Sequence, residues 1–453
     1  MTHETVNGLS YRRENTQLSL SSWGNYPSAP QTGHPCHWQT DLGPQWHRVV
    51  EIYGSSLPFG NGRSYGDSCL AASDHVLQMR TLNRLIDADW DNGWICAEAG
   101  ITLGEILQLA VPRGWFLHVT PGTQHVTLGG AVANDVHGKN HHRCGTFAHS
   151  VMSFGLHRSM QPPMVCSASE NPQWFAASIG GLGLTGIITW VSLRLRRIQS
   201  SLIDTLRVRF DSLKAFFDLS GEMDAGHEYS VAWIDCLAKG SAQGRGVYTA
   251  GNHCETGPLE AATSHSLRLP IRLPVSLVNP ITLKLFNHFY WQRQPVIRQC
   301  RTLAYRPFFY PLDSIEHWNR LYGHKGFQQF QCVLPSSVAP AALAELLKSI
   351  ARSGSGSFLA VLKRCGDIAS PGLLSFPMPG TSLALDFPQN KTLSRKLLPS
   401  LDAIVREAGG RLYPAKDAHM SGSDFRRAYP AWEQVEAMRD PALISRFWQR
   451  VIQ

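Results

Sequence analysis

The feature that most constrains this chain is a series of three glycine-rich segments, at residues 60–67, 121–130 and 180–188. Glycine lets consecutive backbone N–H groups turn toward one anion and lets the backbone pass close to a flat ligand. The first segment matches neither the Walker pattern nor the Rossmann fingerprint, because no Gly-Lys-Ser/Thr follows it and its glycine spacing differs. Each segment alone is compatible with an ordinary turn or bulge, so the information lies in their order along the chain.

The apolar pattern predicts a mixture of strands and helices. Residues 93–115 are typical of a strand, a turn and a helix that begins with a capping box formed by Thr102 and Glu105. Residues 186–210 are typical of two strands, and the polar break between them, near Gln199 and Ser200, is a candidate domain boundary.

Two amphipathic helices are expected later in the chain, over 339–351 and 395–408, the second of them capped by Gly409 and Gly410. The chain has 453 residues, too many for one core, so two domains are expected. Strands and helices mix without strict βαβ alternation, which favours an α+β fold.

The net charge of +8 indicates nucleic acid, an anionic membrane surface or a phosphorylated ligand. No nucleic-acid-binding motif occurs, which leaves the other two. Between His265 and Leu312 there is neither Asp nor Glu, while large apolar residues alternate with Arg268, Arg272, Lys284, Arg293, Arg298, Arg301 and Arg306. Two interpretations stay open for this span: a solvated basic face above a core-facing stripe, or an interfacial segment beside anionic lipid.

Cysteine and histidine usage argues against a metal site. None of the 10 Cys forms a CxxC pair, so neither zinc nor a compact disulfide framework is expected, and reduced thiols in a cytoplasmic protein are the simpler interpretation. His141 and His142 are adjacent and point to different faces, with no acidic partner at ligand spacing. The N-terminus lacks a signal-peptide core, and no stretch of ~18 apolar residues is present, so the chain is expected to be soluble or peripheral.

Taken in order, the motifs resemble those of the vanillyl-alcohol-oxidase/PCMH superfamily of FAD enzymes, and most closely the decaprenylphosphoryl-β-D-ribose 2′-oxidase family. The strings that carry the resemblance are GRSYGD at 62–67, PGTQHVTLGGAVANDVHGKNHH at 121–142, GGLGLTGII at 180–188, YSVAWIDCLAKG at 229–240, YPLDSIEHWNRLYG at 310–323, LSFPMPG at 374–380 and GGRLYPAKD at 409–417. The resemblance extends over nearly all of the chain from Trp23 onward.

The resemblance implies a PCMH-type FAD-binding domain of two subdomains at 1–196 and a substrate domain at 197–410, built on an antiparallel sheet with flanking helices. The segment 411–453 would return to the FAD domain. FAD would be held without a covalent bond, because Tyr65 stands where some relatives carry the flavin-linking His and no Cys lies in 121–130.

The resemblance also implies the residues of the site. The FAD pyrophosphate would be cradled by backbone N–H groups of the first two segments, Ile187 would lie on the adenine side, and Tyr413 would return to the isoalloxazine. The cofactor-binding residues expected in this way are Gly60, Asn61, Gly62, Arg63, Ser64, Tyr65, Gly66, Asp67, Gly122, Thr127, Leu128, Gly129, Gly130, Asn134, His137, Ile187 and Tyr413. The substrate-binding residues expected are Trp233, Gln329, Gln331, Lys363 and Lys416.

The chemistry agrees with these residue types. Flavin reduction takes up a hydride and leaves negative charge at N1 and the C2 carbonyl, which a fixed cation such as Lys416 would stabilise. Oxidation of an alcohol also needs an acceptor for the hydroxyl proton, and both His137 and Lys416 are candidates. The catalytic residues expected are therefore Lys416 and His137, with the base left open between them.

The function implied is oxidation of a secondary hydroxyl of a polyprenyl-phosphate-linked pentose to a ketone, as the first half of an epimerisation that a short-chain reductase partner completes. An aldonolactone-oxidase-like activity on a soluble sugar lactone is the alternative among enzymes. A flavin-binding scaffold without turnover is a further alternative, disfavoured by the presence of both His137 and Lys416. We expect a cytoplasmic protein with peripheral contact to the anionic inner face of the membrane, and no nucleic-acid partner.

Overall fold

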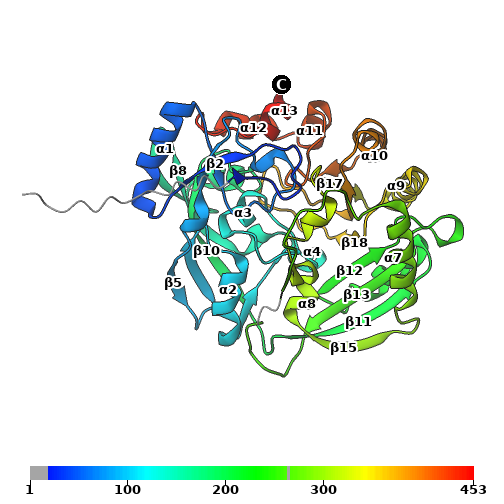
Figure 1. The fold of residues 1–453 in the computed structure, drawn as a ribbon. Coiled ribbons are helices and arrows are strands. Elements are labelled where there is room, and N and C mark those ends of the chain that lie inside the picture. Colours follow the sequence, from blue (N-terminus) through cyan, green and yellow to red (C-terminus); the bar gives the residue numbers. More distant parts are fainter. Residues whose placement is uncertain (1–18, 263–265) are drawn as a thin grey trace, which may run out of the picture.

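The computed structural model describes residues 19–262 and 266–453, whose strands form three main sheets and one small two-stranded pair (Figure 1). Helices lie around and between the sheets, and most strand pairs are antiparallel. The predicted α+β class is therefore confirmed. The expectation of no signal segment concerns residues that lie outside the described part of the chain.

The first sheet is formed near the N-terminus and combines antiparallel and parallel pairs in the order β1-β2-β4-β3. Helix α1 (Gln39–Tyr53) connects two of its strands and buries Leu42, Trp46 and Val49. The strands are β1 (Ser19–Leu20), β2 (Gln31–Pro35), β3 (Leu57–Phe59) and β4 (His75–Gln78).

The second sheet has the strand order β5-β6-β10-β8-β9, with β7 also paired to β10. Its long central strand buries alternate residues, as the sequence pattern predicts. The strands are β5 (Leu85–Asp89), β6 (Trp94–Glu98), β7 (Trp115–Leu117), β8 (Val151–Arg158), β9 (Gln161–Ser167) and β10 (Ile187–Arg197). The helices that accompany it are α2 (Leu103–Ala110), α3 (Leu128–Ala133), α4 (His141–Cys144) and α5 (Pro172–Ser178).

The third sheet has eight strands, in the order β15-β11-β13-β12-β18-β19-β17-β20, and all its pairs are antiparallel. The strands are β11 (Leu202–Phe210), β12 (Tyr229–Ile234), β13 (Gly246–His253), β15 (Gln299–Ala304), β17 (Phe327–Pro335), β18 (Ala360–Cys365), β19 (Gly380–Pro388) and β20 (Arg411–Leu412). The separate pair is β14 (Leu267–Arg268) with β16 (Ile315–Glu316).

Helices α6 (Leu213–Met223), α9 (Ala339–Ser353) and α10 (Leu398–Glu407) pack against the third sheet. Helix α7 (Pro280–Gln292) lies beside its β11–β13–β12 half, and the short helix α8 (Tyr305–Phe309) follows β15. The buried residues of α9 and α10 belong to one hydrophobic core with the inner residues of β12, β17 and β19.

The C-terminal helices are α11 (Gly422–Ala428), α12 (Trp432–Met438) and α13 (Arg446–Ile452). Helix α11 packs against β20 of the third sheet, α12 against α5, and α13 against the turn at Asp67–Cys69, near the first sheet (Figure 1). Short bridges join Ser56 to Leu443 and Ala71 to Ser445. The predicted boundary at 196/197 falls at the end of β10, and the one at 410/411 falls just before β20, which pairs with β17. The division into domains at these residues stays a prediction.

Local sequence signals placed several elements correctly. Thr102 and Glu105 form the predicted capping box of α2, with each side chain accepting a hydrogen bond from the other residue's backbone N–H. The break at 199–200 separates β10 from β11. The helix predicted over 395–408 is divided into a π-helical turn at Leu393–Leu397 followed by α10, and Gly409 ends it with a φ of +67°.

Candidate active site

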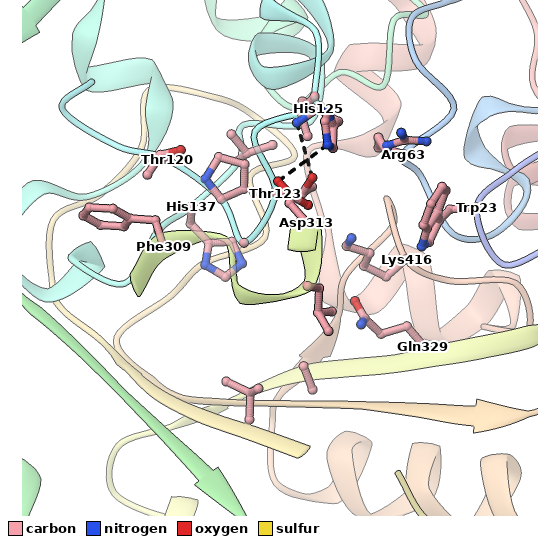
Figure 2. A pocket seen from close by; sticks show the side chains of 18 of the residues that line it. Trp23, Arg63, Thr120, Thr123, His125, His137, Phe309, Asp313, Gln329 and Lys416 are labelled. Atoms are coloured by element: carbon pink, nitrogen blue, oxygen red, sulfur yellow. Dashed lines mark hydrogen bonds and ion pairs between the residues drawn. The ribbon is translucent and has the colours of Figure 1, made fainter. Parts of the chain in front are cut away.

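A cavity of about 1000 Å³ lies between the glycine-rich loops and one face of the third sheet. The sheet contributes every second residue of its strands, because side chains alternate between the two faces of a strand. Lys363 comes from β18, Ser382, Ala384 and Asp386 from β19, Gln329 and Gln331 from β17, and Trp233 from β12. Figure 2 shows that His137, Gln329 and Lys416 surround one space although they come from three separate parts of the chain.

Hydrogen bonds fix the loops of this cavity to one another. The side-chain amide of Asn61 donates to the carbonyl oxygen of His125 at 2.8 Å, which joins the first two glycine-rich segments. The backbone N–H of Tyr65 donates to the carbonyl oxygen of Ala415 at 3.1 Å, which joins the first segment to the C-terminal tail. The tail therefore returns to the loops, as the resemblance implies.

Two glycines of these segments are required by the packing of the protein itself. A Cβ at Gly60 would lie 2.4 Å from Oγ1 of Thr127, and a Cβ at Gly129 would lie 2.8 Å from Cβ of Ala99. Both positions thus allow loops to approach each other closely. A Cβ at Gly122, by contrast, would meet no atom within 4 Å, so this position leaves open space at the wall of the cavity.

Most of the predicted site residues line the cavity. From the cofactor set these are Gly60, Asn61, Gly62, Arg63, Ser64, Tyr65, Gly122, Thr127, Gly129, Gly130, Asn134, His137 and Tyr413. From the substrate set all five line it, namely Trp233, Gln329, Gln331, Lys363 and Lys416.

Four predicted cofactor residues do not line the cavity. Ile187 begins β10 with its side chain packed in a hydrophobic cluster with Leu42 and Trp46, while its neighbour Ile188 lines the cavity from the opposite face of the strand. The prediction for this strand was therefore displaced by one residue. Leu128 is fully buried in the core beneath α3.

Gly66 and Asp67 have structural contacts instead. A Cβ at Gly66 would lie 1.7 Å from the carbonyl oxygen of Asp417, so glycine is needed for the tail to pass. The carboxylate of Asp67 accepts two hydrogen bonds from the guanidinium of Arg450, at 2.9 and 2.8 Å, and Arg450 also pairs with Asp417 at 2.8 Å. These contacts hold the last helix, α13, to the first loop.

His137 lies at one side of the cavity, between two partners. Lys363 donates a hydrogen bond to its Nδ1, and its Nε2 lies 3.2 Å from the side-chain amide nitrogen of Gln331. Burial, followed by the nearby charge of Lys363, holds the pKa of His137 well below its ordinary value. His137 is therefore a neutral imidazole at physiological pH.

Lys416 and Asp386 lie at the other side. The Lys416 ammonium stands 3.7 Å from the centre of the Tyr65 ring. The side chain of Gln329 donates to Oδ1 of Asp386 at 2.6 Å and also hydrogen-bonds Tyr65. Burial lowers the pKa of Lys416 to about 7, against the charge of Asp386, and burial raises the pKa of Asp386 to about 7.

Sequence reasoning missed two cavity residues with strongly altered ionisation. Lys139 donates to the carbonyl oxygen of Phe309 at 2.9 Å, and burial, followed by the charge of Lys363, lowers its pKa to about 7. It stands in the HGKNHH string at 137–142, so its motif was visible although its role was not. Asp386 carries no such signal, because only its pairing with Gln329 across β17 and β19 brings it to the site.

The cavity fits FAD in size and in chemistry. Its volume is at the upper end of the range of about 300–1000 Å³ that is usual for ligand sites, as a dinucleotide together with a substrate requires. Glycine-rich backbone at one end suits a pyrophosphate, and cationic side chains at the other suit a ring that becomes negatively charged on reduction. The described residues contain no group of three or more metal-ligating side chains.

Comparisons with known proteins agree with this geometry. Residues 53–157 match the family described as the FAD binding domain. The decaprenylphosphoryl-β-D-ribose oxidase of Mycolicibacterium smegmatis is 32% identical over 398 residues, which cover 84% of this chain and 85% of that protein. The chain belongs to the decaprenylphosphoryl-β-D-ribose oxidase family.

As a member of this family, the chain is an FAD-dependent oxidoreductase that acts on CH–OH groups, and its cofactor is FAD. An uncharacterized protein of Streptomyces coelicolor is 31% identical over 76% of this chain and 97% of its own length. An L-gulonolactone oxidase of Scyliorhinus torazame is 26% identical, but over only 41% of this chain and 40% of its own.

Proposed function

We propose that this family member oxidises a secondary hydroxyl of a polyprenyl-phosphate-linked pentose to a ketone. The observation that carries this proposal is the form of the cavity, which joins a polar end to an exposed apolar surface. The polar end holds His137, Gln329, Lys363 and Lys416. At the other end, residues of α7, of the turn that follows it and of β15 line the cavity, among them Tyr290, Arg293, Arg301 and Leu303.

The stretch of chain that contains these two elements exposes many large apolar side chains. Described residues between 266 and 304 with at least 38% of their surface exposed are Leu267, Ile271, Val275, Leu277, Ile281, Leu285, Phe286, Phe289, Val296, Ile297 and Leu303. Other apolar residues of the span predicted to be basic and interfacial are buried in the core, namely Val278, Leu283, Tyr305, Phe308, Phe309 and Tyr310, so exposed and core-facing apolar side chains occur together in it. A substrate with a long prenyl chain accounts for an apolar surface next to the cavity, whereas a soluble lactone does not.

Different residues of the site would bind FAD and the sugar. We assign FAD to the loops around Gly60–Tyr65 and Gly122–Gly130, with Tyr413 and Lys416 close to its ring system. The bound FAD supplies the acceptor for the hydride of the alcohol. Trp233, Gln329, Gln331 and Lys363 would hold the sugar, since the two amides and the ammonium offer hydrogen bonds to hydroxyl groups.

Trp233 is itself fixed, because its indole N–H donates to the carbonyl oxygen of Phe358 at 2.8 Å and its ring packs edge-on against Tyr290, 4.6 Å between centres. A ring fixed in this way gives the sugar a rigid wall. The substrate would enter past Tyr290, so its lipid would remain on the α7 side.

The product of this reaction is a keto sugar still attached to its lipid carrier. Inversion of the carbon requires a second step, a reduction from the opposite face. We infer that a short-chain reductase supplies this step, so the two enzymes together would epimerise the sugar.

The surface formed by residues 266–304 also suits an anionic membrane. Along this stretch, exposed apolar side chains are interleaved with basic residues, and it has no Asp or Glu. No helix in the described part of the chain is long and apolar enough to cross a membrane. We therefore propose peripheral contact with the cytoplasmic face of the membrane, where a lipid-linked substrate would be met directly.

Anaerobic mixing of the purified holoenzyme with candidate alcohols tests the proposal. A polyprenyl-phosphate pentose should bleach the flavin, and a short-chain aldono-1,4-lactone should not. Bleaching by the lactone alone would favour the lactone-oxidase alternative, and bleaching by neither alcohol would favour a flavin-binding scaffold without turnover.

A further inference from the structure

We infer that Asp386 accepts the proton of the substrate hydroxyl when the C–H bond is oxidised. The inference rests on the proposed function in that it needs an alcohol substrate, and it names a residue that neither the motifs nor the comparisons assign. It follows from the position of the Asp386 carboxylate in the cavity, between Gln329 and Lys416.

The carboxylate of Asp386 is held in place on both sides. It lies on β19 opposite Gln329 of β17, whose side chain donates to Oδ1 at 2.6 Å. Its own backbone N–H donates to Oγ of Ser357 at 3.1 Å. Only 1% of its surface is exposed, yet it lines the cavity. A fixed carboxylate at the wall of a binding cavity has the geometry that a general base requires.

The two other acidic residues that line the described cavity are engaged elsewhere. Asp313 accepts the backbone N–H of Gln124 at 2.9 Å and lies 3.9 Å from His125, at the loop end. Glu316 accepts the hydroxyl of Ser266 at 2.6 Å, on the exposed rim. Neither carboxylate lies beside Gln329 and Lys416.

The earlier candidates for the base are less suitable. His137 accepts from Lys363 at Nδ1, and the uptake of a proton would place two cations side by side. Lys416 serves better as a cation, since negative charge develops on the flavin. Asp386 then takes the proton while Lys416 keeps its own.

The step balances in atoms and electrons. The O–H bond of the alcohol breaks and its proton passes to the Asp386 carboxylate, which becomes a neutral carboxyl. The C–H bond breaks and its hydrogen leaves with both electrons as a hydride to FAD, while the C=O bond of the ketone forms. The proton later leaves through the cavity to water.

The groups that face Asp386 set its protonation. Lys416 of the tail favours the carboxylate, as does the hydrogen bond from Gln329, while burial opposes it and raises the pKa of Asp386 to about 7. Tyr65 and Tyr322 also face it, and burial keeps the pKa of both well above the ordinary value, so both stay neutral. The carboxylate is therefore increasingly available as pH rises through about 7. Burial also lowers the pKa of Lys416 to about 7, so its ammonium is lost at higher pH and the wild-type rate should rise on the acid side and fall again on the alkaline side.

The experiment compares flavin reduction by a polyprenyl-phosphate pentose between pH 5.5 and 9 in the wild type and three variants. Asp386→Asn keeps the shape of the side chain and its FAD content is checked first. Its rate should fall by about 10²–10⁴-fold, the usual contribution of a general base, and the rise of the wild-type rate on the acid side should disappear. Asp386→Glu should keep that rise but react at least tenfold more slowly, since its carboxylate is displaced. Glu345→Gln, a carboxylate-to-amide change on the exposed face of α9 and outside the cavity, should behave as the wild type.

The outcomes distinguish a failure of the role of Asp386 from a failure of the proposed function. Equal rates and pH profiles in wild type and Asp386→Asn would overturn the role of Asp386 and leave the function intact. If Asp386→Asn does not retain FAD, the test passes to Asp386→Glu. A wild-type rate in that variant would overturn the role of Asp386. A wild type that no sugar alcohol reduces would overturn the proposed function, and the role of Asp386 with it.

Discussion

Lys363 donates one hydrogen bond to Nδ1 of His137, 226 residues away in the chain, and another to the carbonyl oxygen of Gly138 at 2.7 Å. The pair places a lysine ammonium against an imidazole, which disfavours a positive charge on the imidazole and, after burial, helps to hold the pKa of His137 well below its ordinary value. Burial also lowers the pKa of Lys363, to about 8. His137 is thus suited to act as a neutral hydrogen-bonding group and unsuited to accept a proton.

We predict that His137→Gln lowers the rate of flavin reduction by about tenfold at every pH, since one neutral hydrogen bond is worth about 0.5–1.5 kcal/mol. Because the pKa of His137 lies well below its ordinary value, the group is neutral across pH 6–9 and its removal should leave the shape of the pH profile unchanged. The measurement is anaerobic stopped-flow reduction over that range. Loss of a limb of the profile would show that His137 titrates in the reaction.

Lys416→Ala should retain FAD and lose reduction by substrate. Backbone contacts of the glycine-rich loops are proposed to carry most of the cofactor binding, whereas the ammonium stabilises charge that develops during reduction. Loss of one such contact typically costs on the order of a hundredfold to a thousandfold in rate. Lys416→Arg should not restore the rate, because a planar guanidinium does not replace a compact ammonium. Lys214→Ala, at an exposed ion pair on α6, is the control, and a wild-type rate in Lys416→Ala would disprove the role.

The flavin should be released by acid or heat. Among the described residues that line the cavity, Cys69 is the one cysteine, and burial raises the pKa of its thiol to about 12, which leaves little nucleophilic thiolate. Tyr65 stands where some relatives carry a flavin-linking histidine. The release of flavin is measured by acid precipitation, followed by the absorbance of the pellet and the supernatant. Yellow colour in the pellet would indicate a covalent bond.

Gly122→Val and Gly129→Val should fail in different ways. The new side chain at Gly122 has open space on the cavity side, so the variant should fold but bind FAD more weakly. At Gly129 it would overlap Ala99, and overpacking typically costs about 1–3 kcal/mol, so the melting temperature of the apoprotein should fall. Apoprotein melting and FAD titration separate the two effects. Normal FAD affinity in Gly122→Val would place the cofactor away from this loop.

The holoenzyme should float with anionic vesicles at low salt and dissociate at high salt. Basic residues near an anionic surface contribute about 1 kcal/mol each, and the exposed apolar side chains of α7 add to this. The double variant Ile281→Asp/Phe289→Asp should reduce vesicle binding at least tenfold. Ile52→Asp on α1, an equally exposed apolar position, is the control. Equal flotation of all three proteins would show that α7 does not contact the membrane.

The sequence by itself determined features that depend on near neighbours. The capping box of Thr102 and Glu105, the αL glycine at Gly409 and the break before β11 follow from local backbone preferences, and the structure has all three. The ordered motifs were enough to indicate FAD and the enzyme class, because their order and spacing resemble those of a known family of FAD enzymes, and the mixture of apolar periods indicated the α+β fold.

Tertiary structure decided what depends on register and on distant segments. Successive side chains of β10 point to opposite faces of the sheet, so the packing of the strand decides whether Ile187 or Ile188 faces the cavity. Gly66 is required by the backbone of Asp417, and Asp386 reaches the site only through its pairing with Gln329. Such contacts join residues far apart in the chain, and no local preference encodes them. The sequence therefore determined which groups are available, and the packing of three sheets decided which of them face the cavity.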